Sequence, residues 1–386
     1  MIKFILISFL IWRIVLFLPL FASEQFLKYR IAYDYTNIWK FIEPYQPVSS
    51  FLLYPWANFD GVHYLLIAGQ GYTNNFGFLP LFPLLIRAVS SLFGTGTTLG
   101  VIQFFSGFFL SNLFFLTSLF VLYKLLSLDY SKKTVFLSII FLLLFPTSFF
   151  FGSIYSESLF LLLLLLSFYF ARKKQWLWAS VFGMMLSVTR IIGIFILLAL
   201  IYEFIKQACL PAGRKKRVSS KLIPILLIPV GIISYGFYNL NKTGSFFYFL
   251  QAHANMGTER SADAIILMPQ TLFRYAKILS TLPITQFEWW IALLEVSIFF
   301  VASFLLYVAW KKKVRTSYLI FAVLAFLLPA SSGTFTGLPR YSLVIFPIFI
   351  ALALLKNRTL QMLYVLISSI LLFILLMFFS KGYFIA

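Results

Sequence analysis

The sequence predicts an all-α polytopic membrane protein of about 11 transmembrane helices, with re-entrant or interfacial helices and outer loops. Hydrophobic residues make up 61% of its 386 residues and charged residues only 11%, whereas about a quarter of the residues of a soluble domain are charged. Apolar runs of roughly 20 residues, enough to cross a ~30 Å hydrocarbon core, recur along the chain. No polar segment is long enough to fold outside the membrane, so we expect a single membrane-embedded domain over residues 1–386.

The basic residues predict how the chain is oriented. The net charge of +20 lies in short loops between apolar runs, which is the pattern of the positive-inside rule. It is not combined with exposed aromatic residues, as nucleic-acid binding requires, so we expect membrane lipids as partners and no nucleic acid. The loops assigned to the cytoplasm hold more than half of the 31 basic residues but only two of the 11 acids, Asp129 and Glu203. This distribution indicates that the chemistry takes place outside.

The N-terminal segment, residues 1–22, is basic and then apolar, and Arg13 interrupts it. It is too long for a signal-peptide core, so it predicts an uncleaved first helix, 2–21, that leads outward. The first outer loop then covers about 23–98. Within this loop, the apolar segment 79–93 is short for a span and contains prolines, which predicts an interfacial or re-entrant helix.

The later apolar segments alternate between basic inner loops and outer ends. The segment 176–204 has basic clusters on both sides but only about 30 residues, roughly 45 Å of helix. If both clusters are cytoplasmic, it must go out and come back, so we expect two short helices that meet near Arg190. A large outer loop covers about 241–288. The other expected helices are 99–126, 135–150, 157–171, 222–240, 289–310, 317–328, 342–355 and 360–379.

The segment 54–72 of the first outer loop holds the first group of candidate site residues. With Asn58 as the expected N-cap, a short helix places Asp60, His63 and Tyr64 at positions i, i+3 and i+4 on one face. An acid, an imidazole and a phenol would then converge at the outer membrane surface. A second interpretation is a capped amphipathic helix whose first-turn acid is favoured by the helix dipole.

A second group lies where the helices 135–150 and 157–171 are joined. Glu157 begins the second of these helices at the membrane boundary, and Tyr155 and Ser156 precede it. The carboxylate could accept hydrogen bonds from sugar hydroxyls, with Tyr155 as a stacking surface. The alternative is a residue at the helix start that is stabilised by the dipole.

Two arginines lie where cations are costly. Arg190 interrupts apolar sequence, where a charge costs at least ~2.5–3.5 kcal/mol and faces a cavity or a partner; a structural pair with Glu157 or Asp60 is the simpler interpretation. Arg340 follows Pro339 at the expected outer start of a helix, where the dipole and the positive-inside rule both disfavour a cation. We interpret Arg340 as the sign of a bound anion such as a phosphate.

The remaining polar candidates indicate no metal and no familiar cofactor motif. Gln251 and His253 lie in the large outer loop and are expected to turn outward, so both histidines of the chain are outside. His63, His253 and Asp60 have metal-ligand chemistry, but without HxxxH or HxH spacing we expect no metal. The chain has no P-loop, dinucleotide fingerprint or nucleophile elbow, and its one cysteine, Cys209, excludes an intrachain disulfide.

Several short motifs follow one another in order along the chain. They are Phe59-Asp60-Gly61-Val62-His63-Tyr64, Ile67-Ala68, Gly71-Tyr72, 79–87, Pro146, Tyr155-Ser156-Glu157-Ser158, Thr189-Arg190 and Leu338-Pro339-Arg340-Tyr341. In this order and spacing they resemble the PIG-V-type mannosyltransferases, the family of the second mannosyltransferase of glycosylphosphatidylinositol assembly and its prokaryotic relatives. That family belongs to the GT-C superfamily of multi-spanning glycosyltransferases. The resemblance covers nearly the whole chain.

The resemblance implies a GT-C-like bundle that transfers a mannosyl (hexosyl) residue, with inversion, from a polyprenyl-phosphate donor. The acceptor would be a lipid, glycan or protein outside the cytoplasm, and the enzyme a multi-pass protein of the cytoplasmic (plasma) membrane with its active site on the outer face. It implies Asp60 as the catalytic base and no cofactor beyond the lipid-linked donor. The expected substrate-binding residues are His63, Tyr64, Tyr155, Ser156, Glu157, Arg190, Gln251, His253, Arg340 and Tyr341.

Two departures from the family pattern concern the same regions. Phe59 stands where many relatives have tryptophan before the aspartate, and no tryptophan follows Gln251 as the family loop pattern has it. Two other functions stay open on the sequence. A lipid-sugar transporter or flippase without transfer activity suits an intramembrane Arg190 and broken helices, and a non-enzymatic assembly subunit is the third alternative. The charges at outer helix ends and the lack of visible repeats favour the transferase.

Overall fold

The computed structural model describes residues 1–31, 33, 50–94, 100–208, 220–254 and 266–385. The described residues form α-helices and short 3-10 helices and contain no β-strand. Within these described ranges, five helices are long and apolar enough to cross a membrane, and three shorter apolar helices accompany them. The chain is therefore a helical multi-pass membrane protein, with fewer long spans than the 11 expected. The long spans are Ile2–Phe26, Val101–Leu126 (α7), Ile223–Thr243, Phe287–Lys311 (α15) and Arg358–Ser380 (α19).

The first span is interrupted, although its position agrees with the expected helix 2–21. It consists of α1 (Ile2–Val15) and α2 (Leu18–Phe26). Pro19 lies in the first turn of α2, where its missing N–H costs no hydrogen bond. The third span is likewise composed of two parts, the 3-10 helix η5 (Ser220–Leu227) and α12 (Ile228–Thr243).

The expected pair of short helices around Arg190 is confirmed. The two are α10 (Trp176–Ser187) and α11 (Ile196–Ala208), with the 3-10 helix η4 (Ile191–Phe195) between them. Arg190 itself has extended backbone, with φ −151° and ψ 146°. A Cβ at Gly193 would lie 2.3 Å from the carbonyl oxygen of Leu186, so only glycine allows this turn to fold so closely onto α10.

Two expected helices end or break early at prolines. The helix expected at 135–150 is α8 (Lys132–Leu143), and the 3-10 helix η3 (Ser148–Gly152) follows Pro146. The prediction of a single helix over 342–355 is wrong. This part of the chain is divided into α17 (Leu338–Tyr341), the 3-10 helix η6 (Ser342–Val344) and α18 (Pro347–Ala353). Because Pro347 has no N–H, an α-helix cannot continue through it with its full set of hydrogen bonds.

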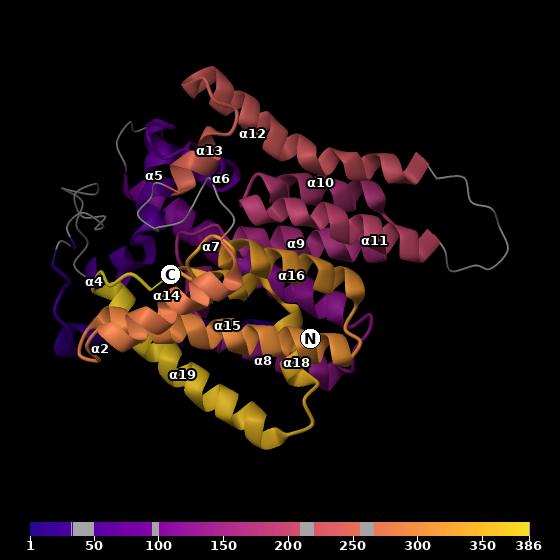
Figure 1. Cartoon of the computed structure of the whole chain (residues 1–386). Helices are drawn as coiled ribbons and strands as arrows, with labels where there is room; N and C mark the ends of the chain where they lie inside the picture. The colour runs from indigo at the N-terminus through magenta and orange to yellow at the C-terminus, as the bar shows by residue number, and fades with distance from the viewer. Residues whose placement is uncertain (32, 34–49, 95–99, 209–219, 255–265, 386) are drawn as a thin grey trace.

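The core of the bundle is α9 (Glu157–Arg172), in which every residue of the sequence from Glu157 to Leu165 is buried. It packs against α7, α10 and α11, and its Phe160 and Phe168 rings contact that of Phe321 in α16 (Thr316–Ala330), which runs beside it in Figure 1. Short helices gather at the left end of the bundle in that view. They are α4 (Ser50–Leu53), α5 (Asp60–Gln70), α6 (Leu81–Ser90) and α13 (Tyr248–Ala254), with α14 (Met268–Thr281) beside α15.

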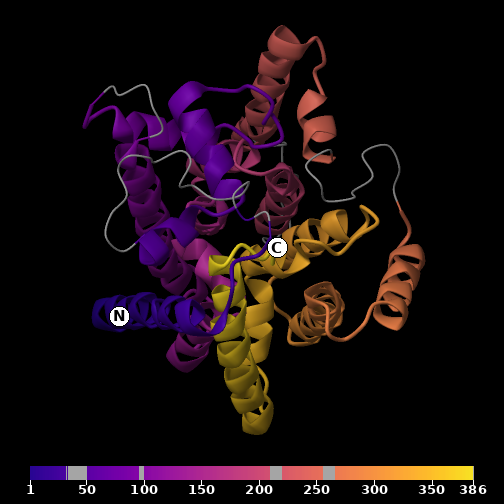
Figure 2. The same ribbon diagram turned by 90° about the vertical axis from the view of Figure 1, so that its left-hand side faces the viewer.

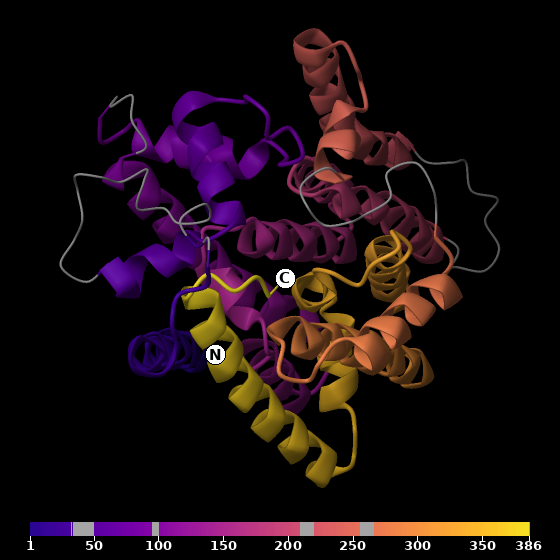
Figure 3. The ribbon, with the colours of Figure 1, turned by 60° about the vertical axis from the view of Figure 1, so that its left-hand side comes forward.

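The second helix of the chain, α2, packs against the last helix, α19. Figures 2 and 3 show the N-terminal segment in indigo next to α19 in yellow. The Ser380 hydroxyl donates a hydrogen bond of 2.9 Å to the Ser23 hydroxyl. Lys381, with 1% of its surface exposed, pairs with Glu24 and lies 4.0 Å from the centre of the Tyr29 ring. These contacts join the two ends of the chain at the edge of the bundle.

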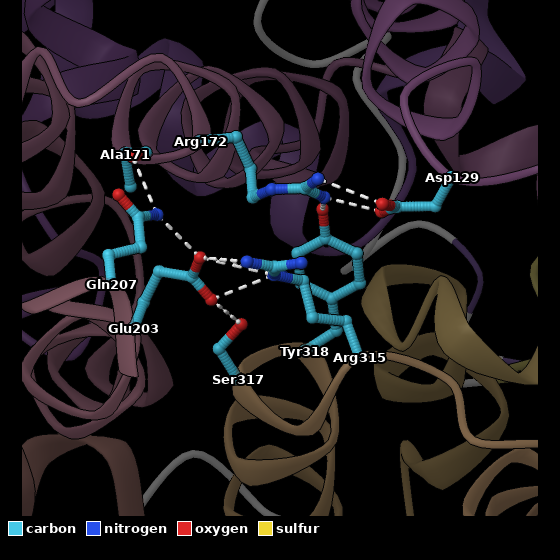
Figure 4. A network of polar contacts seen from close by, with 8 residues as sticks. All are labelled: Asp129, Ala171, Arg172, Glu203, Gln207, Arg315, Ser317 and Tyr318. Atoms are coloured by element: carbon cyan, nitrogen blue, oxygen red, sulfur yellow. Dashed lines mark hydrogen bonds and ion pairs between the residues drawn. The ribbon is translucent and has the colours of Figure 1, made fainter. Parts of the chain in front are cut away.

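A network of charges joins the helix ends at the opposite end of α9 from Glu157 (Figure 4). Arg172, the last residue of α9, donates to Asp129 at 2.8 Å and to the Tyr318 hydroxyl at 3.1 Å. Arg315 donates to Glu203 at 2.8 Å. Asp129 and Glu203, the two acids that the sequence assigns to cytoplasmic loops, thus both accept hydrogen bonds in this network. Because α9 rises 1.5 Å per residue, this network lies roughly 22 Å from Glu157.

Candidate functional site

Two segments of the chain lie side by side, one just before Asp60 and the other just before Glu157. The N–H of Ile154 donates to the carbonyl of Trp56 at 2.7 Å, and the Tyr155 hydroxyl donates to the carbonyl of Asn58, also at 2.7 Å. Trp56 and Tyr155 are fully buried, with 0% and 1% of their surfaces exposed. The segment before Asp60 and the segment before Glu157 are therefore held together as a unit.

The helix expected after residue 58 begins at Asp60, but Asn58 is not its cap. The Asn58 side chain is buried, donates to the carbonyl of Phe379 at 2.9 Å and accepts from the Tyr33 hydroxyl at 3.1 Å. The capping position is Phe59, whose φ of 57° is unusual for a residue with a side chain. Such strain persists only where the surroundings enforce it, and the Phe59 ring packs 5.5 Å from that of Phe379.

Four charged side chains form a cluster, which we call the ion-pair cluster: Asp60, Glu157, Arg190 and Arg340. Arg340 pairs with Asp60, and Arg190 pairs with Glu157. The Nε of Arg340 also lies 3.4 Å from Oε1 of Glu157. The exposed side-chain fractions are 2% for Glu157, 10% for each arginine and 22% for Asp60. The cluster is electrically neutral, and Asp60 is its most accessible member.

Aromatic rings surround the two arginines. The Arg190 Cζ lies 4.5 Å from the centre of the Tyr341 ring, and the Arg340 Cζ lies 5.4 Å from that of Tyr155 and 5.6 Å from that of Phe150. At such distances the faces of aromatic rings attract cations. Because Tyr155 is buried against Arg340, it has no free face on which a sugar could stack in this arrangement.

Arg340 does not lie at the start of a long helix, as the sequence indicated. Its helix, α17, has four residues, too few to supply an N-terminal anion site. The side chain is buried, and the anions that compensate it are the carboxylates of Asp60 and Glu157. The Thr147 hydroxyl donates to the carbonyl of Pro339 at 2.9 Å, which holds this segment in place. For Arg190, the interpretation as an ion-pair partner of Glu157 is confirmed.

Three polar residues of α5, Asp60, His63 and Tyr64, contact residues outside their own helix. Asp60 contacts Arg340, and the buried Tyr64 donates from its hydroxyl to that of Ser156 at 2.9 Å. His63 stacks on Phe78, with 4.8 Å between ring centres. Tyr64 thus connects α5 with the segment that begins α9, and Asp60 connects it with Arg340.

The charges of the cluster set the protonation of Asp60 and His63. Burial raises the pKa of the Asp60 carboxyl, but the Arg340 guanidinium and, to a smaller extent, His63 lower it, so that the pKa lies below its ordinary value of 3.8. Burial lowers the pKa of the His63 imidazole, and Asp60 offsets part of that effect. The Arg340 guanidinium thus favours the charged form of Asp60, and burial favours the neutral form of His63.

Two further residues expected in the site, Gln251 and His253, belong to α13. Gln251 is exposed on α13, and α13 packs on α12 through contacts such as that of Phe249 with Tyr235, 5.7 Å between ring centres. The backbone of His253 belongs to the same helix. Within the part of the chain that the structure describes, no group of histidine, cysteine or acidic residues could hold a metal ion. Cys209 lies outside the described residues.

The sequence analysis overlooked a buried acid in a membrane span. Glu295 lies in α15 with 3% of its surface exposed and accepts a hydrogen bond from the Tyr275 hydroxyl. The Tyr275 hydroxyl in turn accepts from the N–H of Phe335 at 2.9 Å, five residues before Arg340. An acid inside an apolar run was the available signal, because such residues are costly and mark functional or structural sites.

A sequence model of the family described as Mannosyltransferase (PIG-V) matches residues 2–237, more than half of the chain. No curated protein matches it.

Among solved structures, the oligosaccharyltransferase of Archaeoglobus fulgidus is similar at 13% identity. For its apo form the TM-score is 0.43, and the matched region covers 86% of this chain and 52% of the oligosaccharyltransferase chain. The form tethered with an acceptor peptide containing the NVT sequon has a TM-score of 0.44 and covers 97% and 55%. The chain thus spans about half the length of that protein, and the similarity is too low to transfer a fold or an activity.

Proposed function

The chain belongs to the mannosyltransferase (PIG-V) family, and on that premise we propose that it transfers a mannosyl residue, with inversion, from a polyprenyl-phosphate donor. The acceptor is a hydroxyl group of a lipid, glycan or protein outside the cytoplasm. The observation that carries this proposal is the Asp60–Arg340 pair at the accessible edge of the ion-pair cluster. It places a carboxylate that can take a proton beside a guanidinium that can bind a phosphate.

The chemistry of the transfer requires both groups. The acceptor oxygen attacks the anomeric carbon, its proton passes to the Asp60 carboxylate, and the bond from that carbon to the phosphate oxygen breaks. The electron pair leaves with the phosphate, which gains one negative charge. Arg340 and Arg190 stabilise that charge without a metal. Since a phosphate leaves readily as an anion, one carboxylate suffices, whereas glycosidases generally use two.

Binding of the donor changes the pairing within the cluster. Each arginine is neutralised by a carboxylate, so an incoming phosphate competes with Asp60 for Arg340. When Arg340 turns to the phosphate, Asp60 loses the cation that lowers its pKa and becomes a stronger base. Glu157, between the two guanidinium groups, keeps them close together throughout. The donor therefore activates the base that its own transfer needs.

The position of the cluster supports a site on the outer face of the cytoplasmic membrane. The cluster lies at the N-terminal end of α9, and the network around Arg172, which includes the acids assigned to cytoplasmic loops, lies at its C-terminal end. Basic residues favour the cytoplasmic side of a membrane. A lipid-linked donor would reach such a site from the bilayer, with its polyprenyl chain among the apolar helices.

The test is transfer by the purified protein in detergent. Radiolabelled polyprenyl-phosphate mannose is incubated with candidate acceptor lipids and glycans, in parallel with polyprenyl-phosphate glucose and with a nucleotide-linked mannose. We expect label in the acceptor only from the polyprenyl-phosphate mannose, and none with the Asp60→Asn variant. Transfer from the nucleotide sugar alone would overturn the donor assignment. Vectorial movement of the lipid-linked sugar in vesicles without transfer would support the transporter instead.

A further inference from the structure

The guanidinium group of Arg13 lies in the middle of the first span and pairs with none of the acids that the structure describes. Both terminal nitrogens of Arg13 are buried, and neither has a hydrogen-bond partner within the residues that the structure describes. A cation inside a membrane span is costly and marks a functional residue by default. Its position in the last turn of α1 offsets part of that cost through the helix dipole. The ion-pair cluster does not include Arg13, so its role must lie in other contacts.

Three aromatic rings surround the Arg13 guanidinium. Its Cζ lies 3.9 Å from the centre of the Trp56 ring, 4.7 Å from that of Phe108 and 5.3 Å from that of Phe17. A cation is attracted to the face of an aromatic ring, most strongly to that of tryptophan, and more so when it is desolvated. Because the guanidinium is planar, it can also stack on a ring, which an ammonium group cannot do. Arg13 thus holds the Trp56 ring at a defined distance.

The same guanidinium lies against the turn that leads to Glu157. A Cβ at Gly152 would lie 2.5 Å from Nη1 of Arg13, so a side chain there would displace the guanidinium. The neighbouring residue Trp12 donates from its indole N–H to the Ser148 hydroxyl at 3.2 Å. The end of α1 therefore contacts η3, five residues before Glu157, as well as Trp56, four residues before Asp60.

We infer that Arg13 is a positioning residue for the transfer reaction. Its guanidinium, between the Trp56 ring and the Gly152 turn, fixes the two segments whose pairing brings Asp60 to the arginines held by Glu157. These segments are joined directly by the hydrogen bond between Ile154 and Trp56, and Arg13 packs against both sides of that joint. The inference rests on the function proposed above for the ion-pair cluster.

Arg13→Ala, Arg13→Lys and Gly152→Ala test this inference in the full-length protein in detergent. We expect Arg13→Ala to lower kcat at least tenfold while the KM for the donor stays within twofold, because Arg13 positions Asp60 but does not touch the donor. Arg13→Lys should recover part of the rate because it keeps the positive charge. The recovery should be incomplete because the planar group is lost. Ile14→Ala, a change at the adjacent and 67% exposed position of α1, is the matched control and should leave both constants unchanged.

A double-mutant cycle separates the proposed contact from general damage to α1. Gly152→Ala should lower kcat in the wild-type background, because its Cβ displaces the guanidinium. In the Arg13→Ala background, where that space is free, it should have little further effect. Equal effects of Gly152→Ala in both backgrounds, or an unchanged kcat for Arg13→Ala, would overturn the inference while leaving the proposed function intact.

The melting temperatures of the four proteins of the cycle provide a readout that does not depend on activity. These proteins are the wild type, Arg13→Ala, Gly152→Ala and the double variant. Non-additive melting temperatures confirm the contact between Arg13 and the Gly152 turn, and additive ones overturn it. If the wild-type protein transfers no sugar from any donor, the proposed function fails, and the positioning role fails with it. The two failures can therefore be told apart.

Discussion

Arg340 donates a hydrogen bond to the carboxylate of Asp60, although 280 residues separate the two in the sequence. The pair joins α5 to α17 at the accessible edge of a neutral cluster of four charges. It supplies the compensating anion for a cation that the sequence analysis assigns to the outer side, where the positive-inside rule disfavours one. It also means that each of these two side chains limits the reactivity of the other.

Asp60→Asn should abolish transfer and strengthen donor binding. An amide cannot take the acceptor's proton, so the rate should fall by about 10²–10⁴-fold, the usual contribution of a general base. Arg340 would then have one competitor fewer for the phosphate. The rate is measured with radiolabelled donor and the affinity by direct donor binding. If the variant kept more than a few per cent of the activity, Glu157 would be the next candidate base.

Arg340→Ala should weaken donor binding and also destabilise the protein. Removal of one partner leaves the carboxylates of Asp60 and Glu157 without their cation, and breaking a buried pair in this way costs about 3–5 kcal/mol. The double variant Arg340→Met, Asp60→Asn should recover thermal stability but not donor binding. Normal donor binding by Arg340→Ala, together with a lower melting temperature, would show that Arg340 is a structural partner and not a phosphate ligand.

The Asp60–Arg340 pair should make stability depend on pH in one direction. Because the pKa of Asp60 is lower in the folded protein than its ordinary value of 3.8, the stability that it contributes is fully present above that value. It is lost as the pH falls through the folded pKa. Wild type should therefore lose its stability advantage over Asp60→Asn only below about pH 4. Melting temperatures of both proteins from acid to neutral pH check this, and an advantage that disappears near neutral pH would contradict it.

Glu157→Gln and Glu203→Gln provide a matched pair of substitutions. Both carboxylates are buried, with 2% and 1% of the side chain exposed, and each accepts from an arginine. Both variants should lower the melting temperature. Only Glu157→Gln should raise the KM for the donor, because Glu203 lies at the other end of the bundle. An equal rise in KM for both would mean that the effect reflects general destabilisation.

The single cysteine allows a test of orientation. Cys209 lies in the basic loop assigned to the cytoplasm. A membrane-impermeant thiol reagent should label it only after the membrane is opened. In a Cys209→Ser background, a cysteine in place of the exposed Asn74 should be labelled in intact cells. The reverse pattern would place Asp60 on the cytoplasmic side.

The sequence by itself determined the local features of this protein. Hydropathy depends on the composition of about 20 neighbouring residues, so the long spans, such as α7 and α19, lie close to where they were expected. The helix of Asp60, His63 and Tyr64 follows from helical spacing and from Gly71, whose φ of 89° ends it. The break at Arg190 follows from two features of the segment 176–204. Basic clusters flank it on both sides, so it must cross twice, and it is too short for two helices of full length.

Only the tertiary structure decided which polar groups meet. Asn58 has the side chain of a good N-cap, yet hydrogen bonds to Tyr33 and Phe379, far away in the sequence, take up that side chain. Likewise, no local pattern distinguishes a phosphate from the Asp60 carboxylate as the anion that compensates Arg340. The physical reason is that the cost of burying a charge depends on whatever the fold places beside it. Partners 33 and 280 residues apart, as for Glu157 with Arg190 and Asp60 with Arg340, are brought together by helix packing and not by sequence periodicity.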